Sequence, residues 1–229
     1  MKLVFALLLI GFVLADYDFD YLILDLFMAG AQPVSDGRCH LPDGVSEVSI
    51  HGLWPTDWES YGPNNCPGDA WDASKLSGLK SDLTKYWPTY MSNSDDTFHQ
   101  HEWEKHGTCA AYAKVGNGAV HDELSYFTTV LGLLHKLQIT KALADHNITP
   151  SIHTTYEYSD IVNALHYGTG KLVSVTCLGP HNGPKYFTQA TACYDKTLTQ
   201  IDCPLDLVHR NAQGCKADEF KITYYPLSA

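Results

Sequence analysis

Residues 172–177 read Leu-Val-Ser-Val-Thr-Cys, and residues 186–194 read Tyr-Phe-Thr-Gln-Ala-Thr-Ala-Cys-Tyr. Both stretches are rich in β-branched and aromatic side chains, and the intervening residues 180–184 include two prolines and a glycine. This pattern is typical of two strands joined by a loop. Residues 197–202 and 220–224 predict two further strands, which places most of the strands in the last third of the chain.

Upstream of these strands, apolar residues recur at the spacing of helices. The spacing predicts a helix that stops at Pro88, a longer helix across residues 124–134, and a third at residues 160–166 closed by Gly168. Helices grouped in the middle and strands grouped mainly at the end indicate an α+β fold with an antiparallel sheet. A doubly wound parallel fold would instead alternate strands with helices throughout.

One strand is also predicted early in the chain. Residues 48–53 suggest a strand that runs into a turn at residues 51–55, His-Gly-Leu-Trp-Pro. Because no repeat, low-complexity tract or linker interrupts the sequence, we expect residues 16–229 to form a single domain.

The N-terminal residues 1–15 combine Lys2 with an apolar run that ends in Val13-Leu14-Ala15. This arrangement is typical of a secretory signal peptide. A membrane anchor would need about 20 apolar residues, whereas this run stops at Asp16. We therefore expect a protein without a membrane span that is secreted or delivered to the endolysosomal lumen.

Seven cysteines follow the leader, and export makes disulfides their expected state. Since seven is odd, at least one thiol is free, capped or paired with another chain. No Cys-x-x-Cys pair occurs, which argues against a zinc knuckle. Asn147-Ile148-Thr149 forms a glycosylation sequon at Asn147, with an unmodified surface loop as the alternative, because Pro150 follows it.

The charge balance limits the ways in which the protein can bind nucleic acid. Lys and Arg number 15 against 26 Asp and Glu, a formal net charge of −11, and removal of Lys2 with the leader leaves 14 − 26 = −12. A high-affinity nucleic-acid binder of the usual basic kind is therefore disfavoured. The 12 histidines would bring the mature chain near neutrality once protonated, so its net charge depends strongly on pH between about 7 and 5.

The densest group of reactive side chains lies in residues 101–109, His-Glu-Trp-Glu-Lys-His-Gly-Thr-Cys. In an α-helix, a rotation of about 100° per residue would place His101, Lys105, Glu102 and His106 at about 0°, 40°, 100° and 140°. One face would then carry two imidazoles, an ammonium and a carboxylate. A solvated helix face with mixed charges is the alternative interpretation.

A zinc site is a second alternative, because the segment superficially resembles His-Glu-x-x-His. The metal motif separates its histidines by four residues, whereas His101 and His106 are five apart and would stand about 140° from each other on an α-helix. The neighbouring Lys105 would also repel a dication. The sequence therefore predicts no metal and no other cofactor.

Phosphodiester transfer to an adjacent hydroxyl would use all four groups. One imidazole would remove the hydroxyl proton, a second would protonate the leaving oxygen, and the cation would offset charge on the five-coordinate phosphorus. RNA supplies that hydroxyl internally as its 2′-OH, so neither a metal nor a covalent enzyme intermediate is required.

Residues 51–55 and 101–109 together resemble the two active-site segments of the ribonuclease T2 family, in the same order and at a similar separation. The resemblance extends over essentially the whole mature chain, because the later cysteines also fall where the family has them. It implies a central antiparallel sheet flanked by helices in a single disulfide-bonded domain.

The same resemblance implies roles for individual residues. His51 would protonate the departing 5′-oxygen, and His106 would act as the base on the 2′-OH. Glu102 and Lys105 would stabilise the pentacoordinate phosphate, and His101 would hold the phosphate. Trp54 would pack against the substrate near the acid histidine. No member of this catalytic set is substituted.

The resemblance also implies a disulfide pairing of Cys66 with Cys109, Cys177 with Cys215, and Cys193 with Cys203. Cys39 would then be the odd thiol, because it has no upstream partner after the leader. We expect a monomer, with a disulfide-linked dimer through Cys39 as the alternative. Loss of one bridge of this kind typically costs about 2–4 kcal/mol.

Base recognition is less clearly encoded. Thr56, Asp57, Trp58 and Tyr61 follow Trp54 and combine stacking rings with hydrogen-bonding groups, so they are candidates for the first base; packing within the loop is the alternative. Phe98 is the matched aromatic residue for the second base. The other histidines, His99 among them, match no family motif and are interpreted as surface or packing residues.

The leading hypothesis is a metal-independent endoribonuclease that cleaves single-stranded RNA by transesterification through a 2′,3′-cyclic phosphate to 3′-phosphate ends. A family member that acts mainly in binding or signalling is the alternative, and a metallohydrolase is the third hypothesis. With unperturbed imidazoles, the activity would peak near pH 5 to 6.

Overall fold

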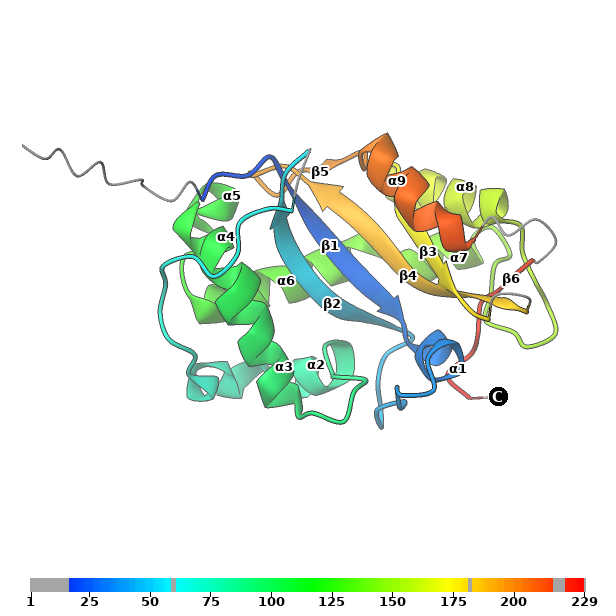
Figure 1. Cartoon of the computed structure of the whole chain (residues 1–229), viewed down its shortest axis with the longest axis horizontal. Helices are drawn as coiled ribbons and strands as arrows, with labels where there is room; N and C mark the ends of the chain where they lie inside the picture. The colour runs from blue at the N-terminus through cyan, green and yellow to red at the C-terminus, as the bar shows by residue number, and fades with distance from the viewer. Residues whose placement is uncertain (1–16, 59–60, 181–182, 216–220, 229) are drawn as a thin grey trace, which may run out of the picture.

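The structure is a computed structural model that describes residues 17–58, 61–180, 183–215 and 221–228 (Figure 1). The predicted signal peptide, residues 1–15, lies outside the described residues. Within the described parts of the chain, no helix has the length and apolar character needed to cross a membrane.

A largely antiparallel sheet forms the centre of the fold, with the main strand order β2-β1-β4-β3. β5 pairs antiparallel with β4, and β6 pairs parallel with it. The strands are β1 (Tyr21–Met28), β2 (Val48–Thr56), β3 (Ser174–Leu178), β4 (Lys185–Tyr194), β5 (Gln200–Ile201) and β6 (Ile222–Thr223). The α+β class and the central antiparallel sheet flanked by helices are confirmed, whereas the two final strands are shorter than predicted.

The sequence patterns did not single out β1, although it lies between β2 and β4 at the centre of the sheet. Its residues Tyr21–Met28 are buried almost throughout. A continuous apolar run that is covered on both faces lacks the alternation by which a strand is recognised. The predicted turn at residues 51–55 is also wrong, because these residues belong to β2.

Most helices precede β3 in the chain. They are α1 (Gln32–Ser35), α2 (Lys80–Tyr86), α3 (Asp95–Glu102), α4 (Thr108–Tyr112), α5 (Val115–Gly118), α6 (Glu123–Leu137), α7 (Ile139–Ala144), α8 (Tyr158–Thr169) and α9 (Leu205–Asn211). Short 3-10 turns form at η1 (Ala29–Ala31), η2 (Ala73–Leu79) and η4 (Ala212–Gly214), and a π-helical turn forms at η3 (Trp103–Gly107). α9 was not predicted.

The predicted end of α8 at Gly168 is wrong by two residues. Gly170 caps the helix with φ +74°, a conformation that glycine adopts at low cost. Gly168 has a different role, because a Cβ there would overlap Ala142 of α7. The absence of a side chain at Gly168 therefore allows α7 and α8 to pack closely.

The two faces of the sheet differ. Alternate residues of β1 (Leu22, Leu24, Leu26 and Met28) enter the main core with side chains of α6 and α8, and Figure 1 shows α6 crossing behind the sheet. On the opposite face, Tyr21 and Ile23 pack against α9, and Phe27 packs beside Tyr90. Asp25 lies between these two small apolar clusters on β1 and occupies the part of this face that carries the site.

Three disulfides are present with the pairing that the resemblance implies. Cys66 pairs with Cys109, Cys177 with Cys215, and Cys193 with Cys203. The first bridge joins the segment after β2 to α4, and thereby links the two segments that contain the predicted catalytic residues. Cys39 has no disulfide partner.

Candidate active site

A β-bulge in β2 positions the first histidine. The register between β1 and β2 shifts between Asp25 and Leu26, and His51 is the extra residue on β2 at this point. A bulge changes which face the following side chains occupy. As a result, Trp54 turns to the same face as His51, while Leu53 enters the main core.

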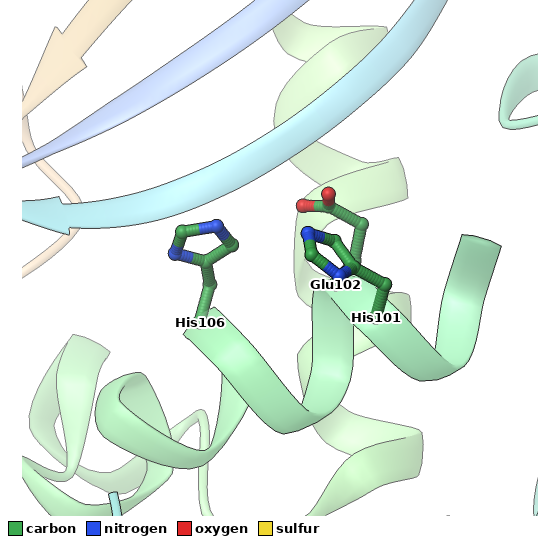
Figure 2. A group of neighbouring side chains, drawn as sticks. All are labelled: His101, Glu102 and His106. Carbon is green, nitrogen blue, oxygen red and sulfur yellow. The ribbon is translucent and has the colours of Figure 1, made fainter. Parts of the chain in front are cut away.

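A π turn positions the second group. α3 continues into η3 at Trp103–Gly107, so the angles expected for an uninterrupted α-helix are wrong beyond Glu102. In a π turn the hydrogen bonds run from i to i+5, which brings residues five apart toward the same face. The ring centroids of His101 and His106 are 6.3 Å apart. One side-chain N or O atom from each of His101, Glu102 and His106 lies within 4.8 Å of the others (Figure 2).

Glu102 is the buried carboxyl group of the site, with 2% of its surface exposed. Trp54 Nε1 donates a hydrogen bond of 2.8 Å to Glu102 Oε2. Gly52 lies directly beneath this pair, because a Cβ at Gly52 would overlap both the carboxylate and the indole nitrogen. Burial raises the pKa of Glu102 to about 7, although His51, the Trp54 hydrogen bond and Lys105 act in the opposite direction.

His106 lies in the least favourable environment for a positive charge. Its Nδ1 is buried and has no hydrogen-bond partner among the described residues. Burial, the neighbouring Lys105 ammonium and the imidazoles of His101 and His51 lower the pKa of His106 to about 3. The ring lies 5.4 Å from that of Trp54 between centroids. His106 is therefore neutral over the range in which an ordinary histidine titrates, which corrects the expectation of an unperturbed value.

His51 has a contrasting environment, which sequence reasoning missed. Its Nδ1 lies 3.0 Å from Asp25 Oδ2, and Gln189 Nε2 lies 3.2 Å from the same nitrogen. The ring stacks on Phe27 with centroids 4.3 Å apart. Asp25 is the only charged residue in the otherwise apolar stretch Tyr21–Met28. This single carboxylate in an apolar stretch is the sequence feature that could have identified a partner for His51.

A cavity of about 610 Å³ connects these residues. It continues from the histidines along the segment after β2 and reaches Leu207 and Arg210 of α9. The sequence-predicted residues that line it are His51, Trp54, Thr56, Asp57, Tyr61, His101, Glu102, Lys105 and His106. Catalytic and base-recognition candidates from separate parts of the chain therefore share one cleft.

The sequence model of the Ribonuclease T2 family matches residues 19–203, which contain both histidine segments. The chain belongs to the ribonuclease T2 family. It is 34% identical over 170 residues to Ribonuclease Oy of Magallana gigas, covering 72% of this chain and 78% of that protein. It is 36% identical over 163 residues to Ribonuclease T2 of Sus scrofa, covering 68% of this chain and 76% of that protein.

Solved structures of this family share the fold. The structure of RNase NT in complex with 5′-AMP superimposes with a TM-score of 0.76 at 30% identity, covering 91% of this chain and 99% of that chain. The chain is thus a ribonuclease T2 family protein both in sequence and in the arrangement of its sheet and helices.

Two residues predicted to bind bases do not line the cleft of this ribonuclease. Trp58 is 54% exposed and stacks on Tyr21 with ring centroids 4.6 Å apart. Phe98 is half-buried, and its ring lies 6.2 Å from that of His51. Trp58 is therefore engaged with Tyr21, whereas Phe98 borders the catalytic group from outside the cavity.

The geometric argument against a metal ion was wrong. The π turn brings the donor atoms of His101, Glu102 and His106 close enough to surround a small cation. Other features of the group favour an anionic ligand instead. Lys105 belongs to the same turn, and the raised pKa of Glu102 keeps this carboxyl protonated below about pH 7, where it can donate to a phosphate oxygen.

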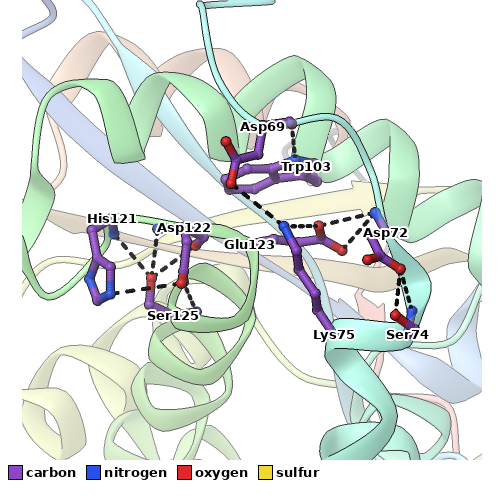
Figure 3. A network of polar contacts seen from close by, with 9 residues as sticks. All are labelled: Asp69, Asp72, Ser74, Lys75, Trp103, His121, Asp122, Glu123 and Ser125. Atoms are coloured by element: carbon purple, nitrogen blue, oxygen red, sulfur yellow. Dashed lines mark hydrogen bonds and ion pairs between the residues drawn. The ribbon is translucent and has the colours of Figure 1, made fainter.

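A polar network supports the π turn from behind (Figure 3). Trp103 Nε1 donates to the carbonyl of Asp69 at 2.9 Å. Fully buried Glu123 accepts from the backbone N–H of Asp72 at 3.1 Å and lies 3.7 Å from Lys75 Nζ. The Trp103 hydrogen bond ties the segment after Cys66 to the π turn, and the contacts of Glu123 hold the same segment against α6.

One further histidine is structural. His99 Nε2 donates to the carbonyl oxygen of Trp87 at 2.7 Å, and its side chain is buried. Burial lowers the pKa of His99. It packs behind the site, as interpreted from the sequence, but it contributes little to the change in net charge near pH 6.

Proposed function

We propose that the protein is a metal-independent endoribonuclease that cleaves single-stranded RNA by transesterification, first to a 2′,3′-cyclic phosphate and then to 3′-phosphate ends. The observation that carries this proposal is the contrast between two imidazoles lining one cleft. His51 lies 3.0 Å from the buried carboxylate of Asp25, whereas His106 is half-buried beside Lys105 and is neutral above about pH 3. An acid and a base are thereby provided at the same pH.

In the first step, His106 accepts the proton of the 2′-OH as the 2′-oxygen attacks phosphorus. The bond from phosphorus to the 5′-oxygen breaks, and His51 donates a proton to that oxygen. Lys105 and the protonated Glu102 offset the charge on the non-bridging oxygens of the five-coordinate phosphorus, and His101 holds the phosphate. In the second step, His51 removes a proton from water, which opens the cyclic phosphate, and His106 returns its proton to the 2′-oxygen.

Substrate recognition would use the part of the cleft beyond the histidines. Trp54 offers a ring beside the phosphate position, and Thr56, Asp57 and Tyr61 line the cavity where the first base would lie. Trp58 and Phe98 would contribute to base binding only after a change in their present packing.

Digestion of RNA in excess chelator, with analysis of the product ends, tests this proposal. The expected products are 2′,3′-cyclic phosphates at early times and 3′-phosphates later, at a rate that chelator does not change. The His51→Ala, His106→Ala double variant is the matched control for contaminating nucleases. Products with 5′-phosphates, or loss of activity in chelator that zinc restores, would favour the metallohydrolase instead.

The compartment and assembly of the protein are part of the same proposal. A secreted or endolysosomal protein would preserve the three disulfides, and Asn147 is exposed and available for glycosylation. Cys39 is half-buried, and burial raises the pKa of its thiol. We expect a monomer in which thiol labelling of the denatured, unreduced protein modifies Cys39 alone; a disulfide-linked dimer on a non-reducing gel would identify the alternative.

A further inference from the structure

Asp25 is a buried charged residue that belongs to neither of the two histidine segments. It lies on β1, with 5% of its surface exposed. Its Oδ2 accepts from Gln189 Nε2 at 2.7 Å and lies 3.0 Å from His51 Nδ1, while its Oδ1 accepts from Thr191 Oγ1 at 2.6 Å. All three partners can donate a hydrogen bond to the carboxylate, so its oxygens can act throughout as acceptors.

The fold alone does not call for a carboxylate at this position. Tyr21 and Ile23 on the same face of β1 pack in one apolar cluster, and Phe27 packs in another. An apolar side chain at position 25 would continue this row, whereas burying a carboxylate is costly unless hydrogen bonds satisfy it. Gln189 and Thr191 satisfy the carboxylate but have no chemistry of their own. His51 is the partner that reaches the cleft.

We propose that Asp25 is a positioning residue for His51, one that holds the proton on Nδ1 and offsets the positive charge of the ring when Nε2 is also protonated. This inference rests on the proposed function, because it specifies how His51 becomes the acid. The contact between Nδ1–H and Asp25 Oδ2 directs the other ring nitrogen, Nε2, away from the strand. Stacking on Phe27 fixes the plane of the same ring. Orientation and charge are therefore set together, as in other pairs of histidine and carboxylate.

The remaining charged groups around His51 do not supply this effect. The helical segment that faces it contributes His101, Lys105 and His106, which are cationic or become cationic when protonated and therefore oppose a second positive charge. Glu102 comes from the same segment, but its raised pKa leaves it uncharged below about pH 7. β4 contributes the neutral Gln189. Asp25 is therefore the carboxylate that can offset the charge of His51 at acid pH.

Asp25→Asn tests the proposal because it removes the charge and keeps the shape of the side chain. We expect NMR of neutral His51, in the absence of RNA, to show a smaller share of the tautomer with the proton on Nδ1 than in the wild type, because an amide oxygen is a weaker acceptor than a carboxylate. Asp145→Asn is the matched control. It also removes one negative charge, but from an exposed side chain paired with Lys141, and should leave the tautomer of His51 unchanged.

Kinetics provide a second readout. Asp25→Asn should lower kcat about tenfold at pH 7, because a less firmly held acid transfers its proton less efficiently, and leave KM for RNA within about twofold. In a His51→Ala background, the same substitution should cost almost nothing. An unchanged His51 tautomer in Asp25→Asn, or an undiminished loss in the His51→Ala background, would overturn the inference.

If Asp25→Asn does not fold, a measurement on the wild-type protein still tests the inference. Nitrogen chemical shifts of neutral His51 should show the proton on Nδ1, and a proton on Nε2 would overturn the inference. These NMR measurements need no substrate. A wild type that fails to cleave RNA would therefore contradict the proposed function, whereas a wild type that cleaves RNA with His51 indifferent to Asp25 would contradict this inference alone.

Discussion

The two histidine segments reach the same cleft by different local irregularities. On β2, a bulge at His51 places both this residue and Trp54 on the open face of the sheet. On the helical side, the π turn at Trp103–Gly107 brings His101 and His106 together. Each irregularity inserts one residue into a regular repeat and re-aims the side chains that follow. Regular elements would have separated these groups.

The two segments also place their imidazoles in different environments. His51 is half-buried, with a carboxylate 3.0 Å from Nδ1. The buried Nδ1 of His106 has no hydrogen-bond partner in the part of the chain that the structure describes. The pKa of His106, which lies next to Lys105, falls to about 3, chiefly through burial. Under the proposed function, the acid lies on the strand and the base on the helix. Four experiments would break or sharpen that division of roles.

The largest effect is expected from removal of either imidazole. His51→Ala and His106→Ala should each reduce turnover of RNA by at least about 100-fold, which is typical of losing a positioned acid or base. A nucleoside 3′-(4-nitrophenyl phosphate) separates the two roles, because its leaving group needs no proton. This substrate should restore most of the rate to His51→Ala and little to His106→Ala.

Folding of both variants is checked by circular dichroism and by the intact disulfides. Equal recovery of the two variants on the activated substrate would break the assignment, and recovery of His106→Ala alone would reverse it.

The next largest effect is expected where the two segments touch. Gly52→Ala should lower kcat/KM more than tenfold, because its Cβ would overlap the Glu102 carboxylate and the Trp54 indole and so displace the hydrogen bond between the segments. Gly132→Ala in α6 is the matched control, since a Cβ there meets nothing within 4 Å. The control should keep full activity and gain up to about 1 kcal/mol of stability from helix propensity. Full activity in Gly52→Ala would show that contact between the segments is not needed.

These irregularities also explain which features could be predicted from sequence. The fold class followed from strand composition near residues 172–194 and from helical spacing before it. The candidate catalytic residues of the helical segment followed from unusual side chains at short separations, and His51 followed from the resemblance to the ribonuclease T2 family. The bulge and the π turn have no signature in periodicity, because both are exceptions to it. β1 was not predicted because both of its faces are buried. The contact between Asp25 on this strand and His51 was therefore not predicted either.

The dependence of activity on pH tests the difference between the two imidazoles directly. Unperturbed values would give a narrow bell near pH 6.5. The structure instead predicts a broad acid plateau, because the base His106 is neutral above about pH 3 and Glu102 stays protonated up to about pH 7. Activity should then fall about fivefold between pH 7 and 8 as Glu102 ionises and repels the phosphate.

A dinucleotide in moderate salt is the appropriate substrate, since long-range repulsion from the negative chain is then screened. Long RNA in low salt should lose more activity on the alkaline side, because the net charge of the protein becomes more negative as histidines deprotonate. A narrow bell centred near pH 6.5 for the dinucleotide would show that His106 is not perturbed.

The smallest effect concerns stability rather than rate. The pKa of Glu102 is raised by burial to about 7, above its usual value of 4.5, so ionisation is less favourable in the folded chain than in the unfolded chain. Its contribution to stability is therefore fully present below about pH 4.5 and is lost as the pH rises to about 7.

Glu102→Gln removes this dependence while keeping a side chain of similar shape. The melting temperature of the variant minus that of the wild type should therefore be larger at pH 8 than at pH 4, by at least about 2–4 °C, which corresponds to about 1 kcal/mol in a domain of this size. The subtraction cancels the titration of His106 and of the exposed carboxylates, which both proteins share.

Glu104→Gln is the matched control, because Glu104 lies two residues away on the exposed side of the same turn and should give a difference that does not change with pH. If the difference for Glu102→Gln were equally flat, Glu102 would be ionised throughout, and the helical segment could not present a neutral carboxyl group to the phosphate at acid pH.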